Sequence, residues 1–250
     1  MNDFQKSLKE ILKEKLEYIN SEECRNECLS YEKRRRELIS FADKYKDKFD
    51  NLSNMIKEKT IRTEYSVGGT SLHRGFYCPS PIEDIIVGNV NRGRLTKNCE
   101  KKDFEYYFDN SGILIGTALI NEYNNGETEY ITATDGIELG IIFDDFSGLR
   151  GVSKCIFRDN KISKYEYASV LSNDLTTEIY GYDESNCLSS VEKYSNFVFE
   201  ANILSHENYI FFHDEKGYLS KFRCVEYLGK KTIKSIYEDP YSKVTVKRKA

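Results

Sequence analysis

The chain contains 250 residues with a formal net charge of -4, and 39% of its residues are hydrophobic. This is enough chain to bury the core of one large domain or of two smaller ones. No apolar run approaches the length that spans a membrane, and the N-terminal segment lacks the apolar core of a signal peptide. We therefore expect a cytoplasmic protein without a membrane partner.

Seven cysteines are scattered along the chain, in an odd number and without the paired spacing of zinc sites. Cys24 and Cys28 stand four residues apart on an expected helix, but no nearby histidine or second cysteine pair completes a metal site. We interpret the cysteines as small, half-buried residues, and we predict no metal and no cofactor.

Residues 1–60 predict helices. The segment is rich in Lys, Glu and Leu, it lacks Gly and Pro, and its apolar residues recur at helical spacing, as at Leu8, Ile11, Leu12, Leu16 and Ile19. Asn20 or Ser21 followed by Glu22 and Glu23 is typical of an N-cap, so we predict two helices rather than one.

The role of this helical region is open between three arrangements: a helical hairpin, a coiled-coil arm and a helix packed on one face of a sheet. Residues 33–36 form a basic run that could contact nucleic acid. Acidic residues surround this run, which favours a solvated helix face instead.

Residues 61–103 read as an irregular connector, because Gly and Pro interrupt them repeatedly. Residues 82–90 predict a short apolar strand, and residues 91–97 predict a turn or strand. The connector also contains a pattern similar to that of metal-dependent nucleases, an acidic residue followed by Glu-x-Lys, at Asp84, Glu100 and Lys102. In such enzymes the carboxylates hold Mg²⁺ and the lysine stabilises developing charge.

A short phrase recurs four times in the second half of the chain: aromatic residues, an aspartate, two residues, a glycine or asparagine, then a Leu or Ile. The copies occupy residues 107–114, 143–149, 182–188 and 212–219. The turn aspartates that we assign to them are 36, 38 and 31 residues apart, namely Asp109, Asp145, Asp183 and Asp214. Recurrence of this kind indicates a repeated structural unit.

The phrase specifies a β-hairpin. Aspartate at the first position of a type I turn accepts a hydrogen bond from the backbone two residues on, and Gly or Asn supplies the left-handed conformation that closes the turn. Alternating aromatic and β-branched residues on both flanks predict strands. Residues 158–161 predict a fifth, weaker turn.

The predicted fold class is therefore α+β. A helical region at 1–60 is followed by the connector at 61–103, a large antiparallel meander sheet of repeated hairpins at 104–229 and a basic C-terminal segment at 230–250.

Charge is segregated along the chain. The four segments carry net charges of +1, +2, -12 and +5 in order, so the hairpin region is strongly acidic although the whole protein is not. A field of this sign attracts basic partners and repels phosphate backbones. We therefore predict no nucleic-acid partner for the sheet.

The hairpin phrase resembles the YD repeats of Rhs-type bacterial polymorphic toxins, and it resembles hairpin-repeat sheets in small bacterial proteins linked to such systems, including proposed immunity proteins. The resemblance covers residues 104–228 and implies an antiparallel hairpin sheet in a toxin-neutralisation setting. An immunity protein works by covering a toxin, often a basic nuclease, with a complementary surface. We therefore predict a non-catalytic protein-binding protein of the immunity type, whose partner is a basic toxin domain.

The acidic and aromatic residues of the hairpins are the predicted partner-binding residues: Asp109, Asp144, Asp145, Asp183, Glu184, Asp214, Glu215, Tyr107 and Tyr182. Two other classes of function compete with this hypothesis. One is the nuclease-like enzyme that would use Asp84, Glu100 and Lys102, and the other is an oligomerisation or scaffold module built on the helical arm.

Overall fold

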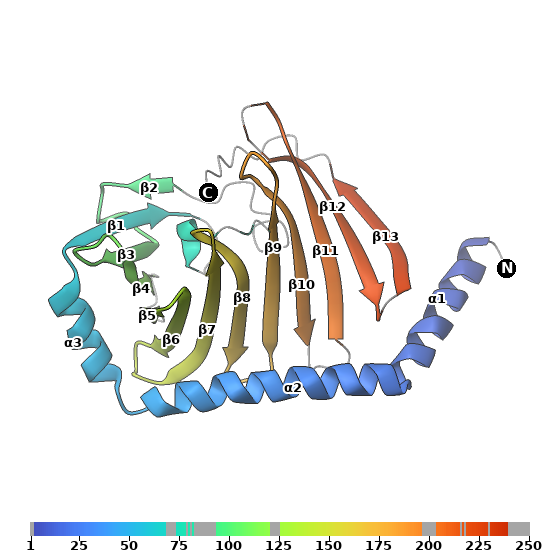
Figure 1. The fold of residues 1–250 in the computed structure, drawn as a ribbon, viewed down its shortest axis with the longest axis horizontal. Coiled ribbons are helices and arrows are strands. Elements are labelled where there is room, and N and C mark those ends of the chain that lie inside the picture. The colour runs from blue at the N-terminus through green and yellow to red at the C-terminus, as the bar shows by residue number, and fades with distance from the viewer. Residues whose placement is uncertain are drawn as a thin grey trace.

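The structure is a computed structural model that describes residues 3–68, 74–78, 80, 82, 94–120, 126–196, 204–215, 217, 219–229 and 231–239. Its helices are α1 (Asp3–Ile19), α2 (Glu22–Ala42) and α3 (Phe49–Lys59), with 3-10 helices η1 (Asp43–Tyr45) and η2 (Gly75–Tyr77). All the strands belong to one sheet (Figure 1): β1 (Arg62–Val67), β2 (Arg94–Thr96), β3 (Phe104–Phe108), β4 (Leu114–Leu119), β5 (Glu127–Thr134), β6 (Ile137–Asp144), β7 (Leu149–Arg158), β8 (Lys161–Ser169), β9 (Leu175–Tyr182), β10 (Leu188–Asn196), β11 (Leu204–His213), β12 (Leu219–Leu228) and β13 (Lys231–Asp239). The predicted α+β class is confirmed.

The sheet is an open antiparallel meander. From β3 to β13 the order of strands in space is their order in sequence, and β1 lies between β3 and β2 at the other end of the sheet. Every pairing in the described chain is antiparallel. The sheet extends beyond the hairpin region in both directions, because the connector supplies β1 and β2 and the C-terminal segment supplies β13. The predicted apolar strand at 82–90 lies outside the described residues, apart from Ile82.

The four phrases form turns of one kind, but the second begins one residue earlier than the sequence predicted. At Asp109, Asp183 and Asp214 the carbonyl oxygen accepts a hydrogen bond from the amide three residues on, as expected for a type I turn. In the second copy Asp144 takes this position in place of Asp145, and Ser147 at φ 64° takes the left-handed position. The reason is that the Asp144 carboxylate accepts from the amides of Phe146 and Gly148, at 2.9 and 2.7 Å.

Two further turns have the tighter two-residue form. The predicted turn at 158–161 is present, and both of its central residues, Asp159 and Asn160, have positive φ. Asp135 and Gly136 join β5 to β6 in the same way, with φ of 52° and 75°. This is the type I′ geometry, whose twist matches that of the flanking strands.

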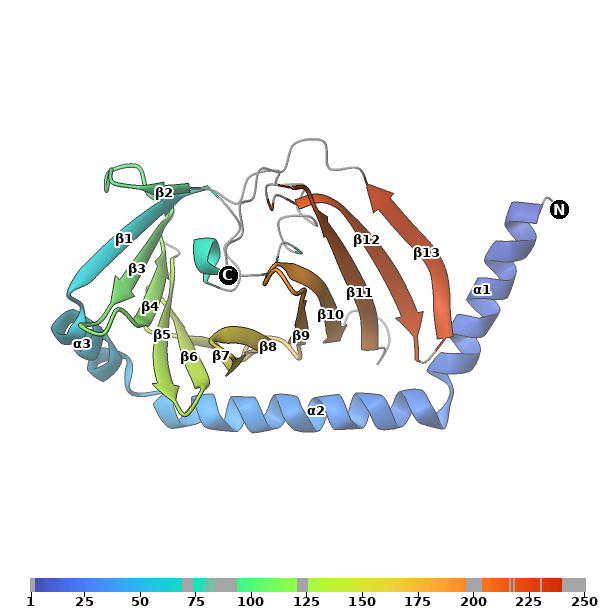
Figure 2. The ribbon, with the colours of Figure 1, turned by 45° about the horizontal axis from the view of Figure 1, so that its top comes forward.

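Of the two predicted N-cap candidates, Ser21 caps α2. Its hydroxyl oxygen accepts a hydrogen bond from the amide of Cys24 at 3.1 Å. The helical region contains a third helix that the sequence did not predict, because the chain bends again at η1 before α3. Figure 1 shows α2 lying across the ends of the central strands, while α1 extends past β13 to the edge of the molecule. Figure 2 shows that the sheet is strongly curved, with α2 and α3 outside the curve.

The two faces of the sheet have separate cores. The outer face packs against α2 and α3 through a cluster that includes Tyr31, Leu38, Leu52, Ile56, Tyr130, Ile141, Phe143, Val152, Ala168 and Leu175. The inner face holds a second cluster from β7 to β12, together with Ile82 of the connector. A third inner cluster of Phe104, Tyr106 and Phe108 packs against η2. Because successive side chains on a strand point to opposite faces, both faces of this sheet are covered by apolar groups.

Polar side chains fix α2 to the sheet. The Tyr31 hydroxyl donates to the Tyr194 carbonyl oxygen at 2.7 Å, and Arg34 donates to Thr177 Oγ1 at 3.2 Å and to the Glu166 carboxylate. Tyr31 and Glu166 are buried. Arg34 belongs to the basic run at 33–36, so this arginine is a docking residue rather than part of a solvated face.

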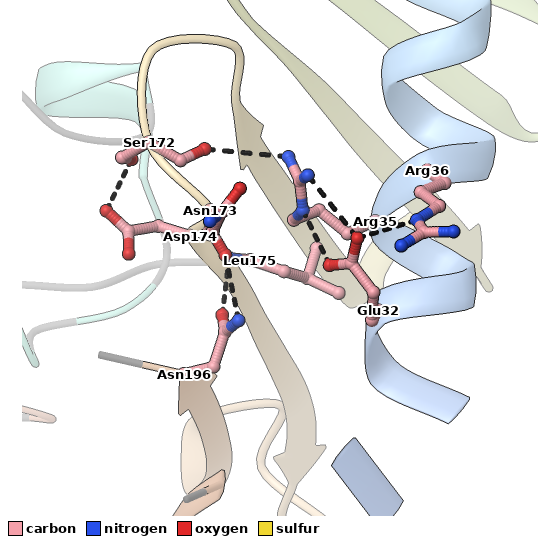
Figure 3. A network of polar contacts seen from close by, with 8 residues as sticks. All are labelled: Glu32, Arg35, Arg36, Ser172, Asn173, Asp174, Leu175 and Asn196. Atoms are coloured by element: carbon pink, nitrogen blue, oxygen red, sulfur yellow. Dashed lines mark hydrogen bonds and ion pairs between the residues drawn. The ribbon is translucent and has the colours of Figure 1, made fainter. Parts of the chain in front are cut away.

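Figure 3 shows the neighbouring anchor, where α2 meets the loop between β8 and β9. Arg35 lies between Glu32, which accepts from its Nε at 2.8 Å, and the Ser172 carbonyl oxygen. The loop is held in turn by Asn196 of β10, which bonds the Asn173 carbonyl oxygen and the Leu175 amide. Within the basic run, Arg34 and Arg35 thereby contact β8, β9 and the loop between them, whereas Lys33 and Arg36 are exposed.

A histidine stack lies on the same outer face, near the N-terminal half of α2. The His206 ring lies between Tyr194 and Tyr227, with ring centroids 4.2 and 4.6 Å away. Burial lowers the pKa of His206 below its ordinary value of 6.5, although Glu192 and Glu27 act in the opposite direction.

We predict that Tyr31→Phe lowers the free energy of unfolding by about 1 kcal/mol, because it removes one donor and leaves the Tyr194 carbonyl oxygen without it. Urea unfolding followed by circular dichroism measures the change. Tyr45→Phe is the control, since Tyr45 packs against the same core but its hydroxyl has no partner within the described chain. Equal losses in the two variants would contradict the assignment of Tyr31.

A second prediction concerns pH. Because the pKa of His206 is lower in the folded than in the unfolded state, the native state binds fewer protons, so stability is complete above pH 6.5 and falls as the pH drops below that value. His206→Phe keeps an aromatic ring in the stack and should flatten the dependence of the unfolding free energy on pH just below pH 6.5. His213→Asn should leave the dependence as it is in the parent. A slope that survives in His206→Phe shows that another group is responsible.

Candidate functional site

Antiparallel order decides which hairpin turns share an end of the sheet. The turns that follow β3, β5, β7, β9 and β11 all lie at one end, and neighbouring turns there are two strands, or about 10 Å, apart. We call this row of turns the hairpin edge; it comprises residues 109–112, 135–136, 159–160, 183–186 and 214–217. The long helix α2 lies across the other end (Figure 1).

The hairpin edge is acidic, and its backbone is held in place. It carries Asp109, Asp135, Asp159, Asp183, Glu184, Asp214 and Glu215, all of them exposed except the half-buried Asp109. Oδ1 of Asp109 accepts from the amides of Ser111 and Ile113 at 2.9 Å each, and Oδ1 of Asp183 accepts from the Cys187 amide at 2.9 Å. The carboxylates that close the turns are therefore presented in a fixed orientation.

Two predicted binding residues lie away from this edge. Asp144 and Asp145 belong to the turn after β6, at the end where α2 lies. Asp144 pairs with Arg150 at 2.6 Å, and Asp145 accepts from the Gly126 amide at 2.9 Å. Burial acts to raise the pKa of Asp144, but its backbone hydrogen bonds and Arg150 outweigh this and hold that pKa below its usual value. Both carboxylates stabilise a turn, so the predicted set does not form one surface.

The two predicted tyrosines are packing residues. Tyr107 is half-buried against the core beneath α3, and its hydroxyl donates to Glu105. Tyr182 packs against the inner core and donates to the Ile162 carbonyl oxygen at 2.9 Å. The predicted aromatic surface is thus mostly interior to the fold.

Glutamates within the strands have intramolecular partners. A Glu-x-Tyr pattern places the tyrosine hydroxyl beside the carboxylate two residues earlier on the same face, as in Glu105/Tyr107, Glu178/Tyr180, Glu192/Tyr194 and Glu207/Tyr209. Burial first, and the neighbouring glutamate second, raise the pKa of Tyr194 to about 12. The tyrosine therefore stays protonated and donates. These strand carboxylates thus have hydrogen-bond donors within the protein, whereas most carboxylates of the hairpin edge are exposed to solvent.

A buried cluster on the inner face was not predicted from the sequence. Arg74, which precedes η2 and has φ of 66°, binds the carboxylate of Glu138, and its Nε lies 3.9 Å from Oε2 of Glu129. Burial acts to lower the pKa of Arg74, but these two glutamates act in the opposite direction, and the arginine stays charged. The cluster fixes the connector against the sheet beside a small pocket, which is lined by Arg74, Gly75, Phe104, Thr117, Leu119, Glu127, Glu129, Ile142, Tyr165 and Tyr167.

Chemistry at this cluster is unfavourable for a cysteine nucleophile. Burial raises the pKa of Cys155 to about 12, so the thiol is protonated at neutral pH. The ion pair of Arg74 with Glu138 holds the packed connector against the sheet, although Nε and Nη2 of Arg74 are buried without a hydrogen-bond partner among the described residues. We therefore interpret the cluster as structural.

The residues of the nuclease hypothesis do not form a site within the described part of the chain. Asp84 lies outside the described residues. Glu100 is exposed in the segment before β3, and Lys102 pairs with Glu105. No group of three or more His, Cys, Asp or Glu side chains suited to a metal ion occurs among the described residues.

The search for relatives gives no family. No protein-family model matches the chain, and no curated protein matches it. Within the part of the chain that the structure describes, no helix combines the length and the hydropathy needed to cross a bilayer.

We predict that Asp183→Ala and Asp183→Asn differ in stability. Alanine removes the acceptor of the Cys187 amide and should lower the free energy of unfolding by about 1 kcal/mol, whereas asparagine keeps a side-chain oxygen at the same place. Chemical denaturation of both variants measures the difference. Equal losses for Asn and Ala would mean that the charge, rather than the hydrogen bond, supports the turn.

Proposed function

We propose that this protein binds another protein, and that the hairpin edge docks a basic surface of that partner. The observation that carries the proposal is the alignment of five aspartate-containing turns at one end of a continuous sheet, with seven carboxylates among them. A row of like charges on neighbouring turns is unfavourable for the isolated protein, and a cationic partner relieves the repulsion.

Preorganisation supports a binding role. The turn backbones are closed by hydrogen bonds, so the Asp109 and Asp183 carboxylates lose little freedom when a partner arrives. Charge complementarity of this kind raises the rate of association and discriminates against acidic partners. The same charge disfavours nucleic acid as the partner, because the phosphate backbone is itself anionic.

The more specific proposal is an immunity-type inhibitor that neutralises a basic toxin domain. It rests on the hairpin phrase, which resembles repeats of bacterial polymorphic toxin systems, together with the acidic hairpin edge. In this form of inhibition the protein covers its partner and supplies no catalytic group, so an exposed row of fixed charges is sufficient.

The test uses the product of the adjacent gene as the candidate partner. An edge variant carries Asp109→Asn, Asp135→Asn, Asp159→Asn, Asp183→Asn and Glu184→Gln, which remove charge but keep side-chain oxygens for the turns. Affinity should fall at least tenfold by calorimetry, equivalent to about 1.4 kcal/mol, and its dependence on salt should weaken. Co-expression should protect cells from the toxin with the parent and fail with the edge variant.

A control variant removes the same number of charges from exposed sites elsewhere: Glu37→Gln, Glu58→Gln, Glu100→Gln, Asp43→Asn and Asp47→Asn. It should keep the affinity of the parent within about twofold. If the two variants weaken binding equally, the effect is one of net charge and the hairpin edge is not the interface. If the parent binds no product of a neighbouring gene, the immunity proposal is wrong.

A further inference from the structure

Helix α1 presents an apolar stripe to solvent. Leu12 is 52% exposed and Leu16 is 60% exposed, one turn apart on the same side of the helix. Such exposure of paired leucines is not needed for the fold, because the outer core is closed by α2 and α3. Figures 1 and 2 both show α1 extending away from the curved sheet at the edge of the molecule, with the N-terminus at its far end.

Charges around α1 are ordered by their angle from this stripe. At 100° per residue, Lys9 and Lys15 lie about 60° from Leu12 on opposite sides, and Lys13 lies about 100° from it. The glutamates lie furthest away, with Glu10, Glu14 and Glu17 about 140° to 160° from Leu12 on the same count. All six charged side chains are exposed. Lysines thus border the apolar stripe on both sides, and glutamates occupy the opposite face.

We propose that α1 is a peripheral membrane-binding helix that lies flat on an anionic lipid surface. The leucines enter the boundary between headgroups and acyl chains, the bordering lysines extend to the phosphates, and the glutamates face water. A lipid surface is flat, so the two sides of the apolar stripe lie at the same depth in it. Lysine on each side of the stripe can therefore reach the phosphates. The helix has 17 residues and spans about 25 Å, which is long enough to lie in the interface.

The charge pattern favours lipid over the other possible occupants. A second copy of α1 packed stripe to stripe would bring the bordering lysines of both copies together, which is repulsive. The inference departs from the expectation, drawn from the length of apolar runs, that no membrane is involved. It is independent of the proposed protein-binding edge, which lies on different elements.

The experiment is flotation of the purified full-length protein with vesicles of phosphatidylcholine alone, or with phosphatidylglycerol added in about equal amount. The parent should float with the anionic vesicles and remain unbound with the neutral ones. Leu12→Gln with Leu16→Gln keeps residues that favour a helix and should reduce binding at least tenfold. Lys9→Gln, Lys13→Gln and Lys15→Gln together should abolish the preference for anionic lipid.

The matched control is Leu29→Gln with Leu171→Gln, which alters two leucines that are 63% and 67% exposed elsewhere on the protein. This control should bind anionic vesicles within about twofold of the parent. Absence of parent binding to anionic vesicles overturns the inference, as does an equal loss in both leucine variants. A parent that binds no vesicles, and whose mass in light scattering falls from dimer to monomer on Leu12→Gln with Leu16→Gln, would identify the stripe as an interface between copies.

Discussion

Local antiparallel pairing is the constraint on which this structure depends. From β3 onward each strand is bonded to its neighbour in sequence, so the position of a residue along the chain determines its position across the sheet. The same constraint fixes the end of the sheet at which each turn lies. Because an open sheet of this kind does not close on itself, its two faces must be covered by other elements. The helices α2 and α3 cover the outer face, and described residues of the connector cover part of the inner face.

The acidic composition of the sheet is compatible with burial because tyrosine and arginine accompany the strand glutamates. Tyrosine two residues after a glutamate lies on the same face and donates to it, so a charged group on a strand acquires a partner without a change in the backbone. Arginine accompanies other buried glutamates, as Arg34 pairs with Glu166. Because the strand glutamates have partners within the protein, most of the exposed carboxylates of the hairpins lie at the hairpin edge.

The sequence predicted local structure well and spatial grouping poorly, for a reason that the turns make plain. The Ser21 cap and the hairpin turns depend on residues within four positions of one another. Whether two turns share an end depends on the number of strands between them. Three strands separate the turns at Asp109 and Asp144, and two separate those at Asp183 and Asp214. The Asp135-Gly136 turn was not predicted, although its residues are typical of a type I′ turn. Recognising it would have given the correct number of strands between Asp109 and Asp144. The docking role of Arg34 required a partner 132 residues away, which no local pattern reveals.

The position of α2 has a consequence for how the chain acquires its structure. A meander with contacts between neighbours can grow hairpin by hairpin, as solenoid repeats do, since no step needs the closure of a long loop. Helix α2 instead depends on a distant contact, because Tyr31 bonds a strand 163 residues further along. On a ribosome α2 is synthesised before all of the described strands, but this contact can form only after β10 has emerged. We therefore expect α2, which is made before the sheet, to join hairpins that form one after another into a single cooperative unit.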